Sequence, residues 1–462
     1  MTTCDVLIVG AGPAGMAAAV RLREAQADVI VVDDARAPGG QVWRAAEQNV
    51  GSTASALGAE YRKGHDAIAR FRASGVRYLS ETEVWRLDEG WHVCVKRRGI
   101  IDRISAKAVV LATGALERPV PFPGWTLPGV MTVGAAQTLL KGAHQIPQDG
   151  VWIAGSGPLV LLYIAQLRAL GGRIAGWLNT APKSNVSAAA KHWPAVLRNI
   201  PDLAKGLAWR ARLALSTVPV FGIRDIAAQG DGRLETISYT TVDGKTAHVD
   251  ANLLLVHEGV VPNIHATIAL GCEHDWSSQQ QCFAPRLDAF QMTTRDDLYV
   301  AGDGGGILGA RAARQTGELA ALGLLERLGR ISKQDRDREA VSLRAALDKE
   351  IAFRRFLDAL FAPRQAVSVP EGETIVCRCE EVTARSICDA ARIPGAGPNQ
   401  VKAFTRAGMG PCQGRQCGLV VSRIIGAMNR KPMESVGYFN IRPPLKPITV
   451  GEMARAAEIE NS

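Results

Sequence analysis

A glycine-rich turn near the start of the chain constrains the fold more than any other segment. An apolar run at 5–9 leads into the pattern Gly-x-Gly-x-x-Gly at 10–15, and an alanine-rich stretch follows at 16–24. This order predicts a strand, a tight turn and a helix. The next apolar run ends at Asp33, 23 residues after the first glycine of the turn. Together these features predict a βαβ unit that binds a dinucleotide.

Each glycine of this turn has its own physical role. Gly10 permits the sharp turn, Gly12 has no Cβ and lets a pyrophosphate approach, and Gly15 lets the helix pack closely on the sheet. The helix that starts at Pro13 and Ala14 directs unpaired N–H groups and a partial positive charge toward the phosphates. We therefore expect these five residues to contact or shape the cofactor site.

The acidic end of the unit predicts which dinucleotide is preferred. Asp33 can accept hydrogen bonds from an adenosine ribose and disfavours a 2′-phosphate. Asp34 follows it directly and is a second candidate for cofactor binding.

A second glycine turn, 155–157, follows the apolar run 151–154 and predicts another Rossmann-like unit. Its third small position is Val160, and the same 23-residue offset falls on Leu178 instead of an acid. A branched side chain holds the helix away from the strand, and no carboxylate meets a ribose. We therefore favour an altered site with weakened nicotinamide binding. An adenine nucleotide at this turn stays an alternative.

Two more strand ends carry residues suited to a cofactor. The apolar run 108–112 ends at Thr113 and Gly114, and a later apolar run ends at Gly302 and Asp303. An acid where a strand meets a helix is well placed to hold polyol hydroxyls. The alternative for Asp303 is an ordinary helix N-cap.

Four cysteines near the C-terminus form the sharpest metal-binding signal. Cys377 and Cys379 are followed, after 32 intervening residues, by Cys412 and Cys417. Four thiolates suit either Zn²⁺ or an iron–sulfur cluster, and the spacing does not choose between them. Two disulfides are disfavoured without an export signal. The sequence has no Cys-x-x-Cys, which argues against disulfide-reductase chemistry.

Charge and hydropathy narrow the kinds of partner and the cellular location that we expect for this chain. The formal net charge is +9 without a Lys/Arg block or a basic–aromatic repeat, so we expect anionic cofactors and no nucleic acid. The longest apolar stretch, 151–170, is interrupted by Gly155 to Pro158, which indicates strand, turn and helix in place of a membrane span. The start lacks the basic region of a secretory signal. We expect a cytoplasmic protein that reaches a membrane only through a complex.

The turn at 10–15, Thr113-Gly114 and Gly302-Asp303 together resemble the pattern of two-dinucleotide-binding-domain flavoproteins, over residues 1–330. The resemblance implies an α/β fold with two Rossmann-like domains and FAD in the first. It assigns the pyrophosphate to the turn, the adenosine ribose to Asp33 and the ribityl chain to Asp303. The loop 38–41, with Gly40 and Gln41, resembles the one that passes close to the flavin, where a Cβ would not fit.

The cysteine region resembles the bacterioferritin-associated-ferredoxin-like [2Fe-2S] domain. Glu-Glu-Val-Thr at 380–383 follows the first pair, and Gly-Met-Gly-Pro at 408–411 precedes the second. The resemblance implies a [2Fe-2S] cluster ligated by the four cysteines in a small helical domain. Because Gly408 and Gly410 free the backbone around them, their N–H groups could turn toward sulfur.

Nearly the whole chain resembles the A-type (α) subunits of opine oxidases, hydrogen cyanide synthase and dye-linked proline and D-hydroxyproline dehydrogenases. Segments 38–44, 117–130 and 442–447 carry this resemblance. It implies an electron-transfer subunit of an oxidoreductase acting on CH–NH donors. The implied partners are an amino-acid-oxidase-type FAD subunit, which oxidises an opine, hydroxyproline or a similar amine, and a small ferredoxin-like subunit.

These signals divide the chain into five expected parts. They are a discontinuous FAD-binding domain, 1–115 plus 290–330; a second Rossmann-like domain, 116–289; a connecting helix and linker, 331–369; the [2Fe-2S] domain, 370–430; and an extended tail, 431–462.

The sequence identifies no catalytic acid or base. His257 and His265 are the nearest candidates, and a lone histidine is more often structural. Two other functions stay open. One is a stand-alone NAD(P)H-dependent flavin reductase that passes electrons to the cluster. The other is a redox scaffold subunit with an adenine nucleotide in the second turn.

Overall fold

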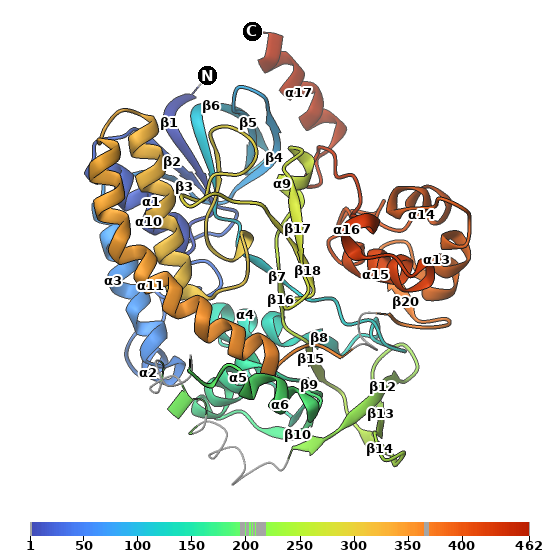
Figure 1. Cartoon of the computed structure of the whole chain (residues 1–462). Helices are drawn as coiled ribbons and strands as arrows, with labels where there is room; N and C mark the ends of the chain where they lie inside the picture. The colour runs from blue at the N-terminus through green and yellow to red at the C-terminus, as the bar shows by residue number, and fades with distance from the viewer. Residues whose placement is uncertain are drawn as a thin grey trace.

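The computed structural model describes residues 2–194, 219–364 and 369–461, together with residues 199, 203, 204, 206 and 208. Two α/β bodies share one side of the molecule, and a helical C-terminal lobe lies beside them (Figure 1). The expected fold class, a two-domain Rossmann-like α/β chain with a helical C-terminal region, is confirmed. Residues 365–368 of the expected linker lie outside the described residues.

The first body is built on a seven-stranded sheet in the order β3-β2-β1-β6-β5-β4, and β19 pairs with β6. Its strands are β1 (Thr2–Val9), β2 (Val29–Val32), β3 (Arg77–Leu79), β4 (Thr82–Asp88), β5 (His92–Arg97), β6 (Ile100–Leu111) and β19 (Leu298–Val300). β1, β2, the end of β6 and β19 run parallel. Their apolar residues are buried because helices cover this region.

The helices of this body are α1 (Pro13–Glu24), α2 (Gly51–Leu57), α3 (Ala59–Ala73) and α10 (Ala310–Arg327), and α11 (Lys333–Leu360) follows them. Figure 1 shows α11 running from α10 toward the second body. α1 and α10 pack closely because small residues line their contact. A Cβ added to Gly317 would lie 2.2 Å from the carbonyl oxygen of Ala14.

The second body contains a five-stranded parallel sheet in the order β11-β10-β9-β15-β8. Its strands are β8 (Val130–Thr132), β9 (Val151–Gly155), β10 (Ile174–Asn179), β11 (Val220–Phe221) and β15 (Leu254–His257), with helices α4 (Val133–Ala143), α5 (Pro158–Ala169) and α6 (Ser184–Ala190). An antiparallel sheet follows, made of β12 (Ile223–Gln229), β13 (Thr236–Thr241) and β14 (Thr246–Asp250).

Two short strand pairs and two short helices join the two bodies. They are the pair β7 (Ala115–Glu117) and β16 (Val260–Pro262), the short helix α9 (His265–Ala269), the hairpin β17 (His274–Ser277) and β18 (Cys282–Pro285), and the 3-10 helix η1 (Gly302–Gly304). These connectors pass through the region where the candidate site lies.

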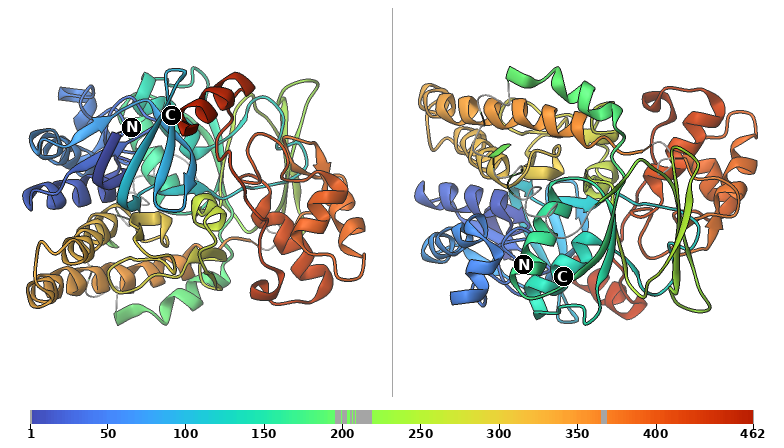
Figure 2. Two further views of the ribbon diagram at one scale, coloured as in Figure 1. Left: turned by 90° about the horizontal axis from the view of Figure 1, so that it is seen from above. Right: turned by 90° about the horizontal axis from the view of Figure 1, so that it is seen from below.

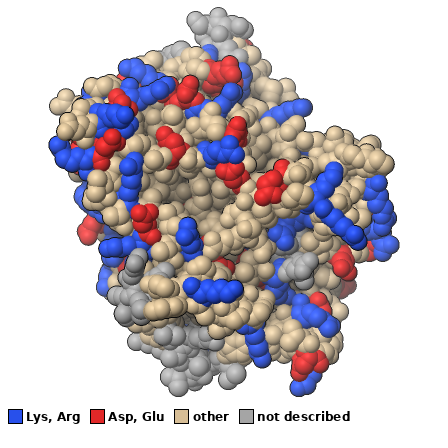
Figure 3. Space-filling model, in the orientation of Figure 1, with Lys and Arg blue, Asp and Glu red and all other residues tan. Residues whose placement is uncertain are grey.

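The C-terminal lobe gathers at one side of the molecule, away from α11 (Figure 2). It contains β20 (Ile375–Cys377), β21 (Val382–Thr383), α13 (Ala384–Ala391), α14 (Pro398–Thr405) and α15 (Gly418–Asn429). Basic and acidic side chains are interspersed on the face of the molecule seen in Figure 3. Among the described residues, no helix is both long and apolar enough to cross a membrane.

The tail differs from the expected extended chain. It contains α16 (Met433–Val436) and α17 (Val450–Asn461), while residues 442–447 form neither helix nor strand. Thr449 and Glu452 exchange hydrogen bonds between side chain and backbone at 3.2 and 2.8 Å, which caps the start of α17. Ala456 then packs with Trp85 and Cys94 of the first body.

Candidate functional site

One cavity of about 1000 Å³ is lined by residues of both α/β bodies. The candidate cofactor residues on its wall are Gly10, Gly12, Pro13, Ala14, Asp33, Asp34, Gly40, Gln41, Thr113, Gly114, Gly302 and Asp303. Gly15 is the one candidate that is not on the wall. The structure therefore brings together segments that are far apart in the sequence.

The first turn leaves its backbone open to the cavity. Gly10 has a φ of +107°, and a Cβ there would lie 2.4 Å from the carbonyl oxygen of Ala112. A Cβ on Gly15 would lie 1.9 Å from the carbonyl oxygen of Gly10, so this glycine is needed for packing of helix on strand. Gly12 is the N-cap of α1 and provides no side-chain cap. The first N–H groups of α1 are thus free for an anionic ligand.

The two candidate acids have different surroundings. Asp33 is buried, and its carboxylate accepts hydrogen bonds from the N–H groups of Ala11 at 2.5 Å and Ala35 at 2.7 Å. Burial raises the pKa of Asp33. Asp34 is exposed and forms an ion pair at 3.1 Å with Lys446 of the tail. Sequence reasoning missed Lys446, because 412 positions separate the two partners.

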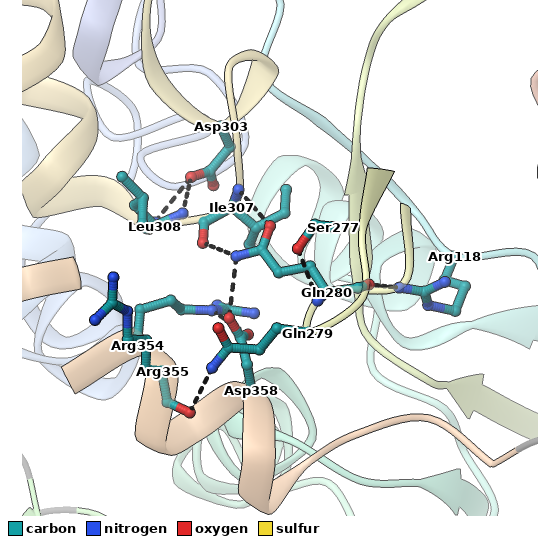
Figure 4. A network of polar contacts seen from close by, with 11 residues as sticks. Arg118, Ser277, Gln279, Gln280, Asp303, Ile307, Leu308, Arg354, Arg355 and Asp358 are labelled. Atoms are coloured by element: carbon teal, nitrogen blue, oxygen red, sulfur yellow. Dashed lines mark hydrogen bonds and ion pairs between the residues drawn. The ribbon is translucent and has the colours of Figure 1, made fainter. Parts of the chain in front are cut away.

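Asp303 holds the loop that precedes α10. Its Oδ1 accepts hydrogen bonds from the N–H groups of Leu308 at 2.9 Å and Gly309 at 2.8 Å. The side-chain amide of Gln280 brackets Ile307 of the same loop, accepting from its N–H at 3.2 Å and donating to its carbonyl at 2.8 Å (Figure 4). Both bonds to Asp303 end on Oδ1, so the capping role leaves Oδ2 for another partner.

The loop with Gly40 and Gln41 is held from the second body. A Cβ on Gly40 would lie 2.9 Å from the Cα of Gly12, so the loop lies directly against the first turn. Lys141 of α4 donates to the carbonyl oxygens of Gln41 at 3.2 Å and Val42 at 3.1 Å. Burial lowers the pKa of Lys141 to about 8. On a helix, a lysine usually indicates the solvent face, which is why the sequence did not reveal this one.

The second turn opens onto the same cavity through Ser156, Gly157 and Pro158. The expectation that position 178 corresponds to Asp33 was wrong. The register of β9 with β10 shifts between Ile174 and Gly176, and this irregularity moves the equivalent position by one residue to Asn179. Its Oδ1 accepts from the N–H two residues later at 3.1 Å, as the carboxylate of Asp33 does.

Both candidate histidines lie on the cavity wall. His257 is buried, and its Nδ1 lies 2.7 Å from Oε1 of Glu117. The Glu117 carboxylate also accepts from the N–H of Gly134 at the start of α4. His265 donates from Nε2 to the carbonyl of Gln413 at 3.1 Å, and burial lowers its pKa to about 3. His265 is therefore neutral and connects the cavity to the cysteine region.

The four candidate cysteines gather in the C-terminal lobe. Cys377 is hydrogen-bonded to Cys417, which lowers the pKa of Cys377 to about 6, and Cys379 is hydrogen-bonded to Cys412. The backbone N–H of Gly408 also donates a hydrogen bond to the sulfur of Cys377. As donors, four neighbouring thiols fit an iron–sulfur cluster or zinc. In the part of the chain that the structure describes, however, no group of three or more His, Cys, Asp or Glu side chains is arranged to hold a metal.

Arg415 joins the cysteine lobe to the cavity. It lines the cavity, and its guanidinium donates to the carbonyl oxygens of Cys412 at 3.2 Å and Leu445 at 2.7 Å. The N–H of Leu445 donates to the carbonyl of Trp85 in β4 at 2.7 Å. The tail thus lies between the lobe and the first body.

The fold and the cavity define the class of FAD-dependent oxidoreductases with two dinucleotide-binding domains. Residues 4–317 match the family described as pyridine nucleotide-disulphide oxidoreductase, and residues 371–457 match the sarcosine oxidase A3 domain. The second match extends through most of the tail.

Curated relatives narrow this class. The chain is 40% identical to the A subunit of opine oxidase from Agrobacterium tumefaciens (strain Ach5), covering 97% of this chain and 91% of that protein. It is 32% identical to the HcnB subunit of hydrogen cyanide synthase from Pseudomonas protegens, covering 96% of each. The chain belongs to the family of opine oxidase A subunits within the pyridine nucleotide-disulphide oxidoreductases, as the sequence resemblance predicted.

A solved structure supports the same architecture. L-proline dehydrogenase from P. horikoshii superposes with a TM-score of 0.70 at 20% identity, covering 98% of this chain and 80% of that one. This likeness concerns the fold.

Proposed function

We propose that this chain is the electron-transfer subunit of a multi-subunit dehydrogenase that acts on amino acids or opines. Its partner is an amino-acid-oxidase-type FAD subunit that oxidises an opine, hydroxyproline or a similar amine, and a small ferredoxin-like subunit completes the complex. The names of the relatives, each a subunit of an oxidase or a synthase, support the part of this proposal that makes the chain one subunit of a multi-subunit enzyme. The observation that carries the proposal is the position of Arg415. This residue lines the cavity and donates a hydrogen bond to the backbone carbonyl of Cys412.

The proposed cofactors are FAD and a [2Fe-2S] cluster. Bound FAD exchanges two electrons and the cluster one at a time, so a chain with both can pass electrons between two-electron and one-electron carriers. We assign the pyrophosphate to the turn at 10–15, the adenosine ribose to Asp33 and the ribityl chain to Asp303. Cys377, Cys379, Cys412 and Cys417 ligate the cluster.

The proposal divides the chain by task. Residues 1–115 and 290–330 bind FAD, and residues 116–289 form the second Rossmann-like domain. Residues 331–369 connect this flavoprotein part to residues 370–430, which bind the cluster at the interface with the partner subunit. The complex resides in the cytoplasm or at the membrane surface.

A cysteine substitution tests the role of the cluster. Cys412→Ser should leave FAD bound and abolish amine-to-dye turnover of the assembled complex. Cys388→Ser is the matched control, because it removes a thiol of the same lobe outside the four. Electron paramagnetic resonance of the reduced protein distinguishes [2Fe-2S] from zinc. Full turnover by a cluster-free Cys412→Ser complex contradicts the proposal.

A stand-alone NAD(P)H-dependent flavin reductase is the second candidate. Ser156 and Gly157 open onto the same cavity as the first turn, which favours it. Rapid mixing with NADH or NADPH separates the two functions, because only the reductase would lose its flavin absorbance within the first turnover. Nucleotide binding without bleaching would instead indicate a scaffold with an adenine nucleotide in the second turn.

A further inference from the structure

Arg118, next to the cavity-lining strand β7, carries a buried charge that the proposed function does not use. The residue lines the cavity and is 5% exposed. Its guanidinium donates to the main-chain carbonyls of Glu258 at 3.1 Å, Gln281 at 3.0 Å and Gln280 at 2.6 Å. Figure 4 shows it reaching the turn that carries Gln280.

The acids around Arg118 are bonded to other groups. Glu258 pairs with Arg364 at 2.9 Å, and Asp358 pairs with Arg354 at 2.5 Å. Glu117 is bonded to His257 and to the start of α4. Among the described residues, no carboxylate lies within salt-bridge distance of Arg118. Carbonyl dipoles solvate its charge and do not cancel it, so a positive charge without a salt-bridge partner stays at this part of the cavity wall.

We propose that Arg118 stabilises negative charge on the flavin ring in this cavity. The inference rests on the proposed function only in requiring FAD there. When FAD takes up two electrons and one proton, the ring keeps one negative charge. A nearby cation in a poorly solvated site favours that state because Coulomb interactions are weakly screened there.

Sulfite provides a probe that requires neither partner nor substrate. Its sulfur lone pair forms a bond to the flavin ring, and the electron pair displaced into the ring leaves it negatively charged, so no oxidant or reductant is consumed. Affinity for sulfite therefore reports positive charge near the ring. The bleaching of flavin absorbance measures this affinity directly.

Arg118 also has a structural role that the test must separate from its charge. Through Gln280 it connects the β17–β18 turn to Ile307 in the loop of Asp303 (Figure 4). Arg118→Lys keeps the charge and loses the three-way carbonyl contact, whereas Arg118→Gln loses the charge. A purely structural role predicts that both variants lose stability and that sulfite affinity does not follow the charge.

The experiment titrates the FAD-loaded proteins with sulfite and measures their midpoint potentials. Removing one unit charge at an effective dielectric of about 20 changes an equilibrium constant by about an order of magnitude. Arg118→Gln should therefore bind sulfite about tenfold more weakly, equivalent to about 30 mV for a two-electron couple. Arg118→Lys should stay close to wild type.

Asp358→Asn tests the same charge balance with the opposite sign. It removes a negative charge from the same wall and should tighten sulfite binding, which keeps the proposal testable if Arg118→Gln does not fold. Wild-type sulfite affinity in flavin-loaded Arg118→Gln, or in Asp358→Asn, would overturn the assignment. A wild-type protein that binds no FAD would instead overturn the proposed function, and this inference with it.

Discussion

The first and second glycine turns share a backbone plan and differ in the groups placed on it. In the first, a Cβ at Gly15 would lie 1.9 Å from a carbonyl oxygen. In the second, the corresponding Val160 is fully buried in the core. Asp33 and Asn179 end equivalent strands with the same side-chain-to-backbone hydrogen bond. The βαβ shape is thus the same in both units, although the side chain at this position is a carboxylate in the first and an amide in the second.

The largest expected effect comes from replacing Gly15, the third glycine of the first turn, by valine, the residue at the corresponding position of the second turn. Gly15→Val places a branched side chain against the carbonyl of Gly10, and such overpacking typically costs about 1–3 kcal/mol and occasionally more. We expect loss of bound FAD and of stability, measured by flavin absorbance and urea unfolding. Val160→Ala is the control, which should cost about 1–2 kcal/mol and keep FAD. Retention of FAD by Gly15→Val would mean that the two turns have equal packing demands.

Lys141 tests how the second body supports the first. Its pKa is about 8 in the folded chain, below the ordinary value of 10.5, so the unfolded chain binds more protons between these values. Stability should therefore rise with pH across this window, by about 3 kcal/mol in total.

The measurement is urea unfolding of wild type and Lys141→Met between pH 8 and pH 10.5. The Lys141→Met variant should lack this rise in stability. Lys63→Met is the control: the side chain of Lys63 is 63% exposed, so this variant should retain the rise. Parallel profiles for wild type and Lys141→Met would show that Lys141 is not held as a buried amine against the loop of Gln41.

Exchanging the strand-end residues sharpens the comparison of the two turns. Asp33→Asn should weaken FAD binding by about 1.5–3 kcal/mol, the contribution of a charged hydrogen bond, as measured by fluorescence titration of the apoprotein. Asn179→Asp should leave FAD affinity unchanged. Equal losses from both substitutions would show that a single ligand spans both turns.

The smallest effect is expected at the ion pair between Asp34 and Lys446. Both side chains are substantially exposed, at 58% and 37%, and such pairs contribute about 0–1 kcal/mol. Lys446→Ala should therefore change FAD affinity by less than about fivefold, and high salt should remove the difference. An effect as large as that of Asp33→Asn would instead assign cofactor retention to the tail.

Much of the fold and most of the candidate wall could be predicted because their signals are local. A glycine pattern between a strand and a helix specifies its turn within about 30 residues, and all but one of the candidate cofactor residues lie on one cavity. Two features departed from the expectation. The capping pair Thr449 and Glu452 is a local signal, and it starts a helix where an extended tail was expected. The shift between Ile174 and Gly176, which a fixed residue count does not include, moves the position equivalent to Asp33 from Leu178 to Asn179.

By itself the sequence determined the two βαβ units, the class of cofactor that they suit, the family, and the four thiols near the C-terminus. Only the tertiary structure decided which charges meet. Lys141 reaches the loop with Gly40 and Gln41 from the second body, Lys446 meets Asp34 across 412 positions, and Arg118 is buried without a carboxylate partner among the described residues. The reason is physical: periodicity and turn chemistry act over a few residues, whereas electrostatic environment depends on every segment that packs against a group.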